Sequence, residues 1–343
     1  MIKTHKNNYK YKTKTIKKRN NKTRKKNIRS KKHTQKYTQK QVINTKKREN
    51  HTHKLKSDDV ILKKLNCSPK DKKDKNNYSC YTDKSLFVLR DRWNLRHPDV
   101  KILTNDPKEI HKLLSNYLSD VCNKESCWLK QKSEFGNLEE NFKDSFAPES
   151  PQEWKKNPNE WLSSVDIMKV MKQFERAYKC FDFIGPSPID FNKRIMYGEC
   201  VWEELCNFSL EDQIKQGKTK IGIIFNTDPH NRPGEHWISM FINIKKKKIF
   251  FFDSVGNKAP QEVMEFVEKI QKQGLQMTPK INFVYDENHP VEHQFGNTEC
   301  GIYSLFFIVH MLEDKMTEHY LKTHILKDEY IQKFRKIYYN DHL

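Results

Sequence analysis

Basic charge is concentrated at one end of this chain, and this concentration decides which residues can fold. Residues 1–80 hold 28 Lys and Arg against 5 Asp and Glu, whereas the other 263 residues hold 37 basic and 39 acidic side chains. The net charge of +21 at pH 7 therefore comes from the first segment. That segment is poor in apolar side chains, so it cannot bury enough surface to offset its ordering entropy. We predict a disordered, Lys-rich tail over residues 1–80.

The basic tail has two interpretations. It could be a solubilising extension, or it could contact a polyanion such as nucleic acid, an acidic protein or an acidic lipid surface. We favour polyanion binding through residues 1–75, because dense positive charge attracts phosphate with or without specificity.

The rest of the chain is long enough to bury a core of its own. The whole chain has no run of about 18 apolar residues, and the tail at its start is too basic and polar for a secretory signal, so we expect neither membrane insertion nor signal-directed secretion. A chain of this length does not need a disulfide framework, so we expect its eight cysteines to be thiols. Cys122 and Cys127 approach the spacing of zinc ligands, but no second pair completes a set. We expect no metal and no organic cofactor.

Hydrophobic periodicity predicts a mixed order of helices and strands. Helices are expected over 107–122, from Ser163 or Ser164 onward, over 260–274 with Gly274 as C-cap, and over 300–313 and 328–339. Strands are expected over 221–225, 237–244, 249–255 and 281–285, and residues 133–160 are expected to be a connector. The order predicts an α+β fold with a small mixed sheet flanked by helices. We divide the chain into the tail, an N-terminal helical accessory region over 81–154 and a main domain over 155–343.

Cys300 stands where a polar loop, "HQFGNTE", meets the apolar stretch "CGIYSLFFIVHML". In the first turn of a helix, unpaired backbone N–H groups and the positive end of the helix dipole favour a thiolate. A cysteine nucleophile also needs a base. His236 is the candidate, since it ends a turn-rich loop and directly precedes the strand "WISMFINI". The alternative is that Cys300 only packs in the core and that His236 is only solvated.

Asp253 can orient this histidine if the strands around it form a hairpin. A turn centred between Ile244 and Lys245 sets His236 opposite Asp253, and a turn at the middle of the four lysines leaves both on the same face about two rungs apart. Asp253 could otherwise only end its strand. Gln294 could be an ordinary loop amide, or it could donate an N–H to an oxyanion beside the backbone N–H of Cys300.

Four motifs in order, "EWLSS", "EHW", "FFFDS" and "QFGNTECG", resemble the ubiquitin-like-protein-specific and adenovirus-type cysteine proteases. The segment from "WLSSVDIMKVMKQFERAY" through "GPSPIDF" is most similar to the thiol proteases of nucleocytoplasmic large DNA viruses, of asfarvirus and giant-virus type. The resemblance implies a papain-like α+β protease fold. It also implies that Cys300 is the nucleophile, His236 the general base, Asp253 its orienting residue and Gln294 the oxyanion donor. Glu299 departs from the Asp that many relatives have before the cysteine, but it keeps the charge.

The resemblance further implies a function and a substrate. Trp161 and Trp237 would flank a narrow slot that admits glycine, so the partner would be a polypeptide with a Gly-Gly-type cleavage site; the alternative is that both are core aromatics. The expected role is maturation of viral structural polyproteins in the virion and in cytoplasmic factories of the host. Alternatives are removal of ubiquitin or a ubiquitin-like modifier, acetyl transfer by the same triad, and an inactive, basic, nucleic-acid-binding virion scaffold. The oligomeric state stays open.

Overall fold

The computed structural model describes residues 66–70, 76–138 and 140–340, all within one compact unit, Asp59–Leu343. Most of the segment predicted as a basic tail lies outside the described residues, so its disorder and its polyanion binding stay predictions. Within the described ranges, every helix is too short or too polar to cross a bilayer.

A five-stranded mixed sheet, with strand order β1-β2-β3-β4-β5, lies at the centre of the C-terminal part. Its strands are β1 (Phe181–Pro188), β2 (Lys220–Asn226), β3 (Trp237–Asn243), β4 (Lys248–Phe252) and β5 (Val284–Glu287). The three central strands are antiparallel, and the edge strands β1 and β5 run parallel to β2 and β4. Every residue of β3 is buried, as expected for a central strand that is covered on both faces.

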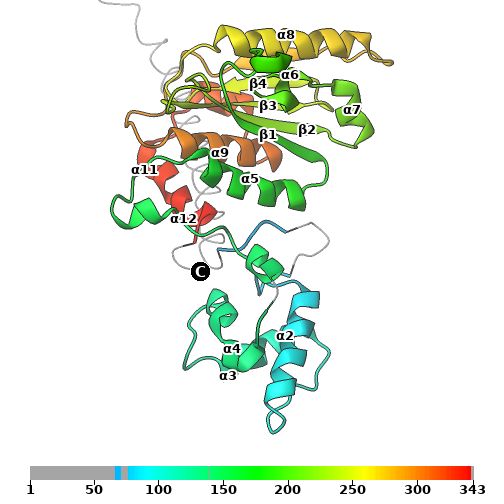
Figure 1. Ribbon diagram of the computed structural model, residues 1–343, viewed down its shortest axis with the longest axis vertical. Coiled ribbons are helices and arrows are strands. Elements are labelled where there is room, and N and C mark those ends of the chain that lie inside the picture. The colour runs from blue at the N-terminus through cyan, green and yellow to red at the C-terminus, as the bar shows by residue number, and fades with distance from the viewer. Residues whose placement is uncertain (1–65, 71–75, 139, 341–343) are drawn as a thin grey trace, which may run out of the picture. The chain divides into compact units, whose positions relative to one another are not determined.

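Helices cover both faces of this sheet (Figure 1): α8 (Gln261–Gln276) lies on one face, and α5 (Ser164–Ala177) and α9 (Cys300–Leu312) lie on the other. The side chains of β3 alternate between the two layers. Trp237 and Phe241 pack in the core with α5 and α9, whereas Ile238 and Met240 pack in the core with α8. All thirteen residues of α9 are buried, so the helix that begins at Cys300 forms the centre of its layer.

The predicted strands correspond to β2, β3, β4 and β5, with shifts at their ends, and the start of α5 is as predicted. Ser163 is its N-cap, and the Ser163 hydroxyl and the Asp166 carboxylate form a capping box. The architecture is the α+β fold with a mixed sheet and flanking helices that the sequence predicted.

Three local predictions were wrong. We did not predict β1, because its Gly and Pro residues resemble turn material; Pro is tolerated there because β1 is an edge strand. Gly274 lies inside α8 and does not cap it. A Cβ there would clash with the carbonyl oxygen of Ile281, so close packing requires the glycine. The helix expected over 328–339 is broken into α11 (Asp328–Ile331), η6 (Gln332–Phe334) and α12 (Arg335–Tyr338).

The N-terminal part is built from short helices around a hydrophobic core of its own, which includes Leu89, Trp93, Leu114 and Trp128. Its elements are α2 (Asp83–Arg96), α3 (Pro107–Tyr117), η2 (Glu125–Lys130), α4 (Lys132–Phe135), η3 (Glu140–Ser145) and η4 (Gln152–Lys155). The helix predicted over 107–122 therefore ends early, and the predicted connector contains helical turns. The remaining short elements are η5 (Met196–Gly198), α6 (Glu203–Cys206), α7 (Leu210–Lys215) and α10 (Glu318–Thr323).

Six of the eight cysteines form disulfides, which corrects the prediction that all are thiols. The pairs are Cys67–Cys80, Cys122–Cys127 and Cys200–Cys206, and Cys180 and Cys300 are free. Each pair has its Cα atoms within bridging distance, which scattered positions in a sequence do not reveal. The pairing of Cys122 with Cys127 also uses both sulfurs that had zinc-ligand spacing.

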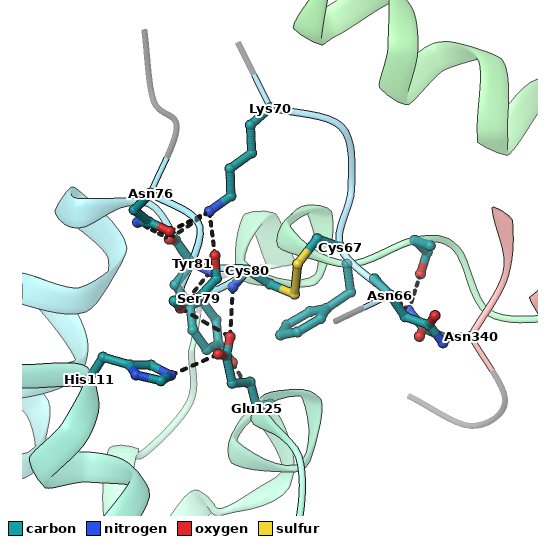
Figure 2. Close-up of a disulfide and its surroundings, with 12 residues drawn as sticks. Asn66, Cys67, Lys70, Asn76, Ser79, Cys80, Tyr81, His111, Glu125 and Asn340 are labelled. Carbon is teal, nitrogen blue, oxygen red and sulfur yellow. Dashed lines mark hydrogen bonds and ion pairs between the residues drawn. A yellow bond between two sulfur atoms is a disulfide. The ribbon is translucent and has the colours of Figure 1, made fainter. Parts of the chain in front are cut away.

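The Cys67–Cys80 disulfide lies inside the segment predicted to be a disordered tail (Figure 2). Lys70 donates to the carbonyl oxygen of Ser79, and the carboxylate of Glu125 accepts from the Cys80 backbone N–H and from the Ser79 hydroxyl. Residues 66–70 and 76–80 are therefore folded onto the N-terminal part, and the predicted boundary at residue 80 is too late.

Candidate active site

Cys300 is the first residue of α9 and is 3% exposed. The first N–H groups of an α-helix have no partner within the helix, so the backbone N–H of Cys300 is available to a ligand, and the helix dipole favours negative charge there. Because Cys300 is outside the three disulfides, its thiol is free to react.

His236 and Asp253 meet at one end of the β3–β4 hairpin. His236 directly precedes β3 and Asp253 directly follows β4, and the His236 Nε2 atom lies 2.6 Å from Oδ1 of Asp253. The observed register pairs Ser239 with Phe252. This register lies midway between the two that the sequence allowed, and in each of the three registers His236 and Asp253 lie on the same face of the hairpin.

The surroundings of His236 favour its protonated form. Burial by itself would lower the pKa of His236, but hydrogen bonds with Asp253 and with the Cys300 thiol, and the negative charges of both groups, raise this pKa to about 10. At neutral pH the imidazole is therefore protonated, with its Nε2 atom against the carboxylate of Asp253. The structure brings together the three residues that the sequence proposed as a triad.

Two buried polar residues, Asn288 and Ser254, support the loops around Asp253 and Gln294, and sequence reasoning had assigned neither a role. Asn288 is fully buried; its Oδ1 accepts from the Asp253 backbone N–H at 2.9 Å and its Nδ2 donates to the Asp253 carbonyl oxygen at 2.8 Å. The carbonyl oxygen of Ser254 accepts from the backbone N–H groups of His293 and Gln294, both at 2.8 Å. Ser254 belongs to the quoted "FFFDS" motif, but nothing in the sequence marks Asn288.

Gln294 is buried, and its side-chain amide is oriented by two hydrogen bonds. Its Oε1 accepts from the Ser254 hydroxyl at 2.7 Å, and its Nε2 donates to the carbonyl oxygen of Gly296 at 2.9 Å. One N–H of this amide is left for another acceptor. No direct hydrogen bond joins Gln294 to Cys300 among the described residues, so its position as an oxyanion donor stays a prediction.

Trp161 and Trp237 line the same hollow, which has a volume of about 590 Å³. Trp161 is 41% exposed, which excludes a core role for that side chain, whereas Trp237 is 9% exposed. The indole N–H of Trp237 donates to the carbonyl oxygen of Leu162 at 3.0 Å, so it ties β3 to the segment that carries Trp161. The other walls come from the 186–188 and 226–234 segments.

The lack of a side chain at Gly301 lets Cys300 lie close to Leu162 and Trp237. A Cβ at position 301 would lie 3.0 Å from Cβ of Leu162 and 3.3 Å from Cδ1 of Trp237, tighter than nearly all real contacts of this kind. The glycine after Cys300 therefore lets α9 begin directly against Leu162 and Trp237.

The arrangement suits nucleophilic attack by sulfur. A thiol that shares a proton with a carboxylate-bound imidazole, at a helix N-terminus, has the surroundings that activate cysteine. Across the described residues, no group of three or more His, Cys, Asp or Glu side chains could hold a metal ion.

Comparisons with known proteins agree with this chemistry. Residues 165–343 match the model of the Ulp1 protease family, C-terminal catalytic domain. A protein of Acanthamoeba polyphaga mimivirus that carries the name of a thiol protease is 26% identical over 270 residues, which cover 77% of this chain and 85% of that protein. A cysteine protease of African swine fever virus is 33% identical over 124 residues, covering 36% of this chain and 44% of the relative.

A solved structure has the same fold. The crystal structure of an African swine fever virus protease superposes with a TM-score of 0.57 at 22% identity, covering 81% of this chain and 96% of the other.

Proposed function

The chain belongs to the Ulp1 protease family and is a cysteine peptidase, and we propose that Cys300, His236 and Asp253 form its catalytic triad. The observation that carries this proposal is the 2.6 Å contact between His236 and Asp253, together with the interaction with Cys300 that helps to raise the pKa of His236. We also propose that residues 155–343 are the catalytic domain and that residues 81–154 are an accessory region.

The proposed reaction is acyl transfer through a covalent intermediate. The sulfur of Cys300, paired with protonated His236, attacks the carbonyl carbon of the scissile bond, and the resulting oxyanion is stabilised by the backbone N–H of Cys300 and by Gln294. The C–N bond breaks as His236 gives its proton to the leaving amine. Water, deprotonated by His236, then attacks the thioester, and release of the acid expels the sulfur anion and regenerates its pair with protonated His236.

The two tryptophans that line the hollow support cleavage after Gly-Gly-type sites. We propose that Trp161 and Trp237 form a slot, named the glycine slot below, in which the residues just before the scissile bond lie. Indole walls close to the backbone leave little room for a Cβ substituent. Trp161→Ala should then lower kcat/KM and relax the preference for glycine with little loss of stability, because Trp161 is 41% exposed. Tyr197→Ala, at an exposed aromatic outside this hollow, is the matched control.

The biological role that we propose is processing of viral structural polyproteins during virion maturation, in virions and host cytoplasm. A second candidate is removal of ubiquitin-like modifiers. It is favoured by a 28% identical relative in African swine fever virus that is named a SUMO-1 cysteine protease.

A suicide probe tests the proposed nucleophile. A short peptide that ends in Gly-Gly and a vinyl warhead should label the wild-type protein and the Cys180→Ser control, but not Cys300→Ser. Cys180 is the other free cysteine and is exposed, so it controls for nonspecific alkylation. Labelling that survives in Cys300→Ser, or proteolysis by that variant, would refute the proposal. Preferential labelling by a ubiquitin-vinyl conjugate over short peptides would favour the second candidate.

A further inference from the structure

The hollow at the glycine slot continues into a larger one. Ser164, Pro186 and Trp202 line both the 590 Å³ hollow and a neighbouring hollow of about 980 Å³. The two therefore form one groove that leads away from Trp161 and along α5. Because the glycine slot is proposed to hold the residues just before the scissile bond, the continuation of the groove can receive residues further upstream.

The second hollow has a fixed wall opposite α5. Gln173 Nε2 donates to the carbonyl oxygen of Phe146 at 2.8 Å in a buried contact, and Arg176 pairs with Asp144 at 2.7 Å. The carbonyl oxygen of Ala147 accepts from Asn340 Nδ2 at 2.7 Å. The segment around residues 143–149 is thus hydrogen-bonded both to α5 and to Asn340, which fixes the position of this wall.

Basic side chains outnumber acidic ones along this second hollow. Its charged lining residues are Lys130, Lys143, Lys169, Lys172 and Arg176, against Asp144 and Glu149. Lys172 pairs with Glu175, and Arg176 pairs with Asp144. Lys169 is exposed, and no carboxylate of the described residues lies within ion-pair distance of its ammonium group. Val165 and Met168 add apolar surface between the basic groups.

We propose that this groove binds an acidic segment of the polypeptide substrate, upstream of the cleavage site. The proposal rests on the proposed protease function and narrows its substrate class. Excess positive charge matches carboxylates, and the apolar residues between the lysines match side chains of a peptide. Continuity with the glycine slot favours a polypeptide over a nucleic acid, since one extended chain can occupy both hollows.

Helix geometry predicts where the acidic residues lie. Lys169, Lys172 and Arg176 stand roughly 8, 12 and 18 Å along α5 from Ser164, at about 1.5 Å per residue. An extended peptide advances about 3.3 Å per residue. The acidic side chains should therefore lie roughly two to six residues upstream of the part of the substrate that contacts Ser164.

The test compares cleavage of matched peptides by full-length protein. The first peptide, called the in-register acidic peptide, carries four acidic residues in this window before Gly-Gly. The second carries Gln and Asn at the same positions. In the third, called the displaced acidic peptide, a Gly-Ser spacer moves the acidic residues further upstream. The variants are Lys169→Glu/Lys172→Glu and the control Lys272→Glu/Lys280→Glu, which makes the same change in charge at exposed positions outside the groove. The basic tail is common to all proteins, so differences between variants report the groove.

For wild-type and control proteins, kcat/KM should be at least threefold higher for the in-register acidic peptide at about 50 mM salt, and the difference should shrink at about 500 mM. The groove variant should lose or reverse this preference while it cleaves a tetrapeptide ending in Gly-Gly at the wild-type rate. Equal cleavage of in-register and displaced acidic peptides would overturn the proposal and leave the protease function intact.

A binding measurement separates this proposal from the proposed function. In a Cys300→Ala background, fluorescence anisotropy should give tighter binding of the in-register acidic peptide, and Lys169→Glu/Lys172→Glu should remove that gain. This result is independent of cleavage, so failure of all cleavage would refute the triad and not the groove. If the groove variant instead lost affinity for a single-stranded oligonucleotide more than for the acidic peptide, the groove would be a nucleic-acid site and the proposal would be wrong.

Discussion

His236 and Asp253 are joined by a 2.6 Å contact between the residue before β3 and the residue after β4. The Asp253 side chain is 3% exposed and the His236 side chain is 18% exposed, so little water screens this pair. The same contact helps to raise the pKa of His236 to about 10, against the effect of burial. The proton on His236 is thus held by the carboxylate of a residue whose backbone is fixed by Asn288.

Asp253→Asn should lower kcat by about 10²-fold or more, because a neutral amide stabilises the imidazolium less. The pH dependence of Cys300 alkylation should change with it. In the wild type the proton stays on His236 up to about pH 10, and in the variant it should be lost at lower pH. Glu235→Gln is the matched control, since Glu235 adjoins His236 but is exposed. An equal loss in the control would move the orienting role away from Asp253.

Gly301→Ala should reduce both stability and activity, because its Cβ would press on Leu162 and Trp237. Overpacking of this kind costs about 1–3 kcal/mol of unfolding free energy. Gly274→Ala is the control, since its Cβ would meet the carbonyl oxygen of Ile281 and a ring carbon of Phe283, in a packed region of α8 outside the candidate site. Urea unfolding and peptide cleavage should show that both variants lose stability, and that only Gly301→Ala loses kcat/KM per folded molecule.

Acid should destabilise the fold through His293. Burial lowers the pKa of this fully buried histidine to about 4, and its Nδ1 accepts from the Leu326 backbone N–H. A histidine in the unfolded chain takes up its proton below about pH 6.5, whereas folded His293 does not until about pH 4, so stability falls as pH decreases across this window. The loss reaches about 3 kcal/mol.

His293→Asn should reduce the slope of that part of the stability profile, measured as unfolding free energy against pH by urea denaturation; the rest of the slope comes from His310, whose pKa burial lowers to about 3. His319→Asn, at an exposed position, should leave the profile unchanged. A wild-type profile with no slope between pH 6.5 and pH 4 would contradict the neutral, buried state of His293.

Deleting residues 1–65 should remove salt-sensitive binding to DNA or RNA and leave peptide cleavage nearly unchanged. Residues 66–343 hold 41 basic and 41 acidic side chains, so the shortened chain keeps no net charge with which to attract phosphate. Gel-shift titrations at several salt concentrations measure the binding. Steep salt dependence in the shortened chain would place the polyanion site in the folded part.

A longer deletion, of residues 1–75, serves as the comparison, because it also removes Cys67. This residue forms a disulfide with Cys80 and an isolated β-bridge with Phe146. The longer deletion should therefore lower the melting temperature, whereas the shorter one should not.

The sequence predicted those parts of the site that local rules govern. Alternation along β3 and β4 fixed the face that His236 and Asp253 share, whatever the position of the turn. The junction of a polar loop with an apolar stretch predicted that a helix begins at Cys300. These features depend on neighbours in the chain.

Contacts between distant segments were not predictable in this way. The support that Asn288 gives to Asp253 joins residues 35 positions apart, and a polar residue in a loop carries no sign that it will be fully buried. The disulfide partners depend on which loops meet in space, and even numbers of cysteines leave many pairings open. The groove along α5 could not be predicted from the sequence either, because its far wall comes from residues around 143–149, which are distant from α5 in the chain.

The complete burial of α9 has a consequence for how this protein can vary. In a saturation mutagenesis experiment, a helix with one solvent-facing side shows tolerant positions every three to four residues. Across Cys300–Leu312 every position is buried, so the intolerant positions should form one unbroken block of thirteen. Adaptation to a new substrate would then have to come from substitutions in the groove walls on other segments, because α9, which carries the sulfur, has no exposed position that tolerates substitution.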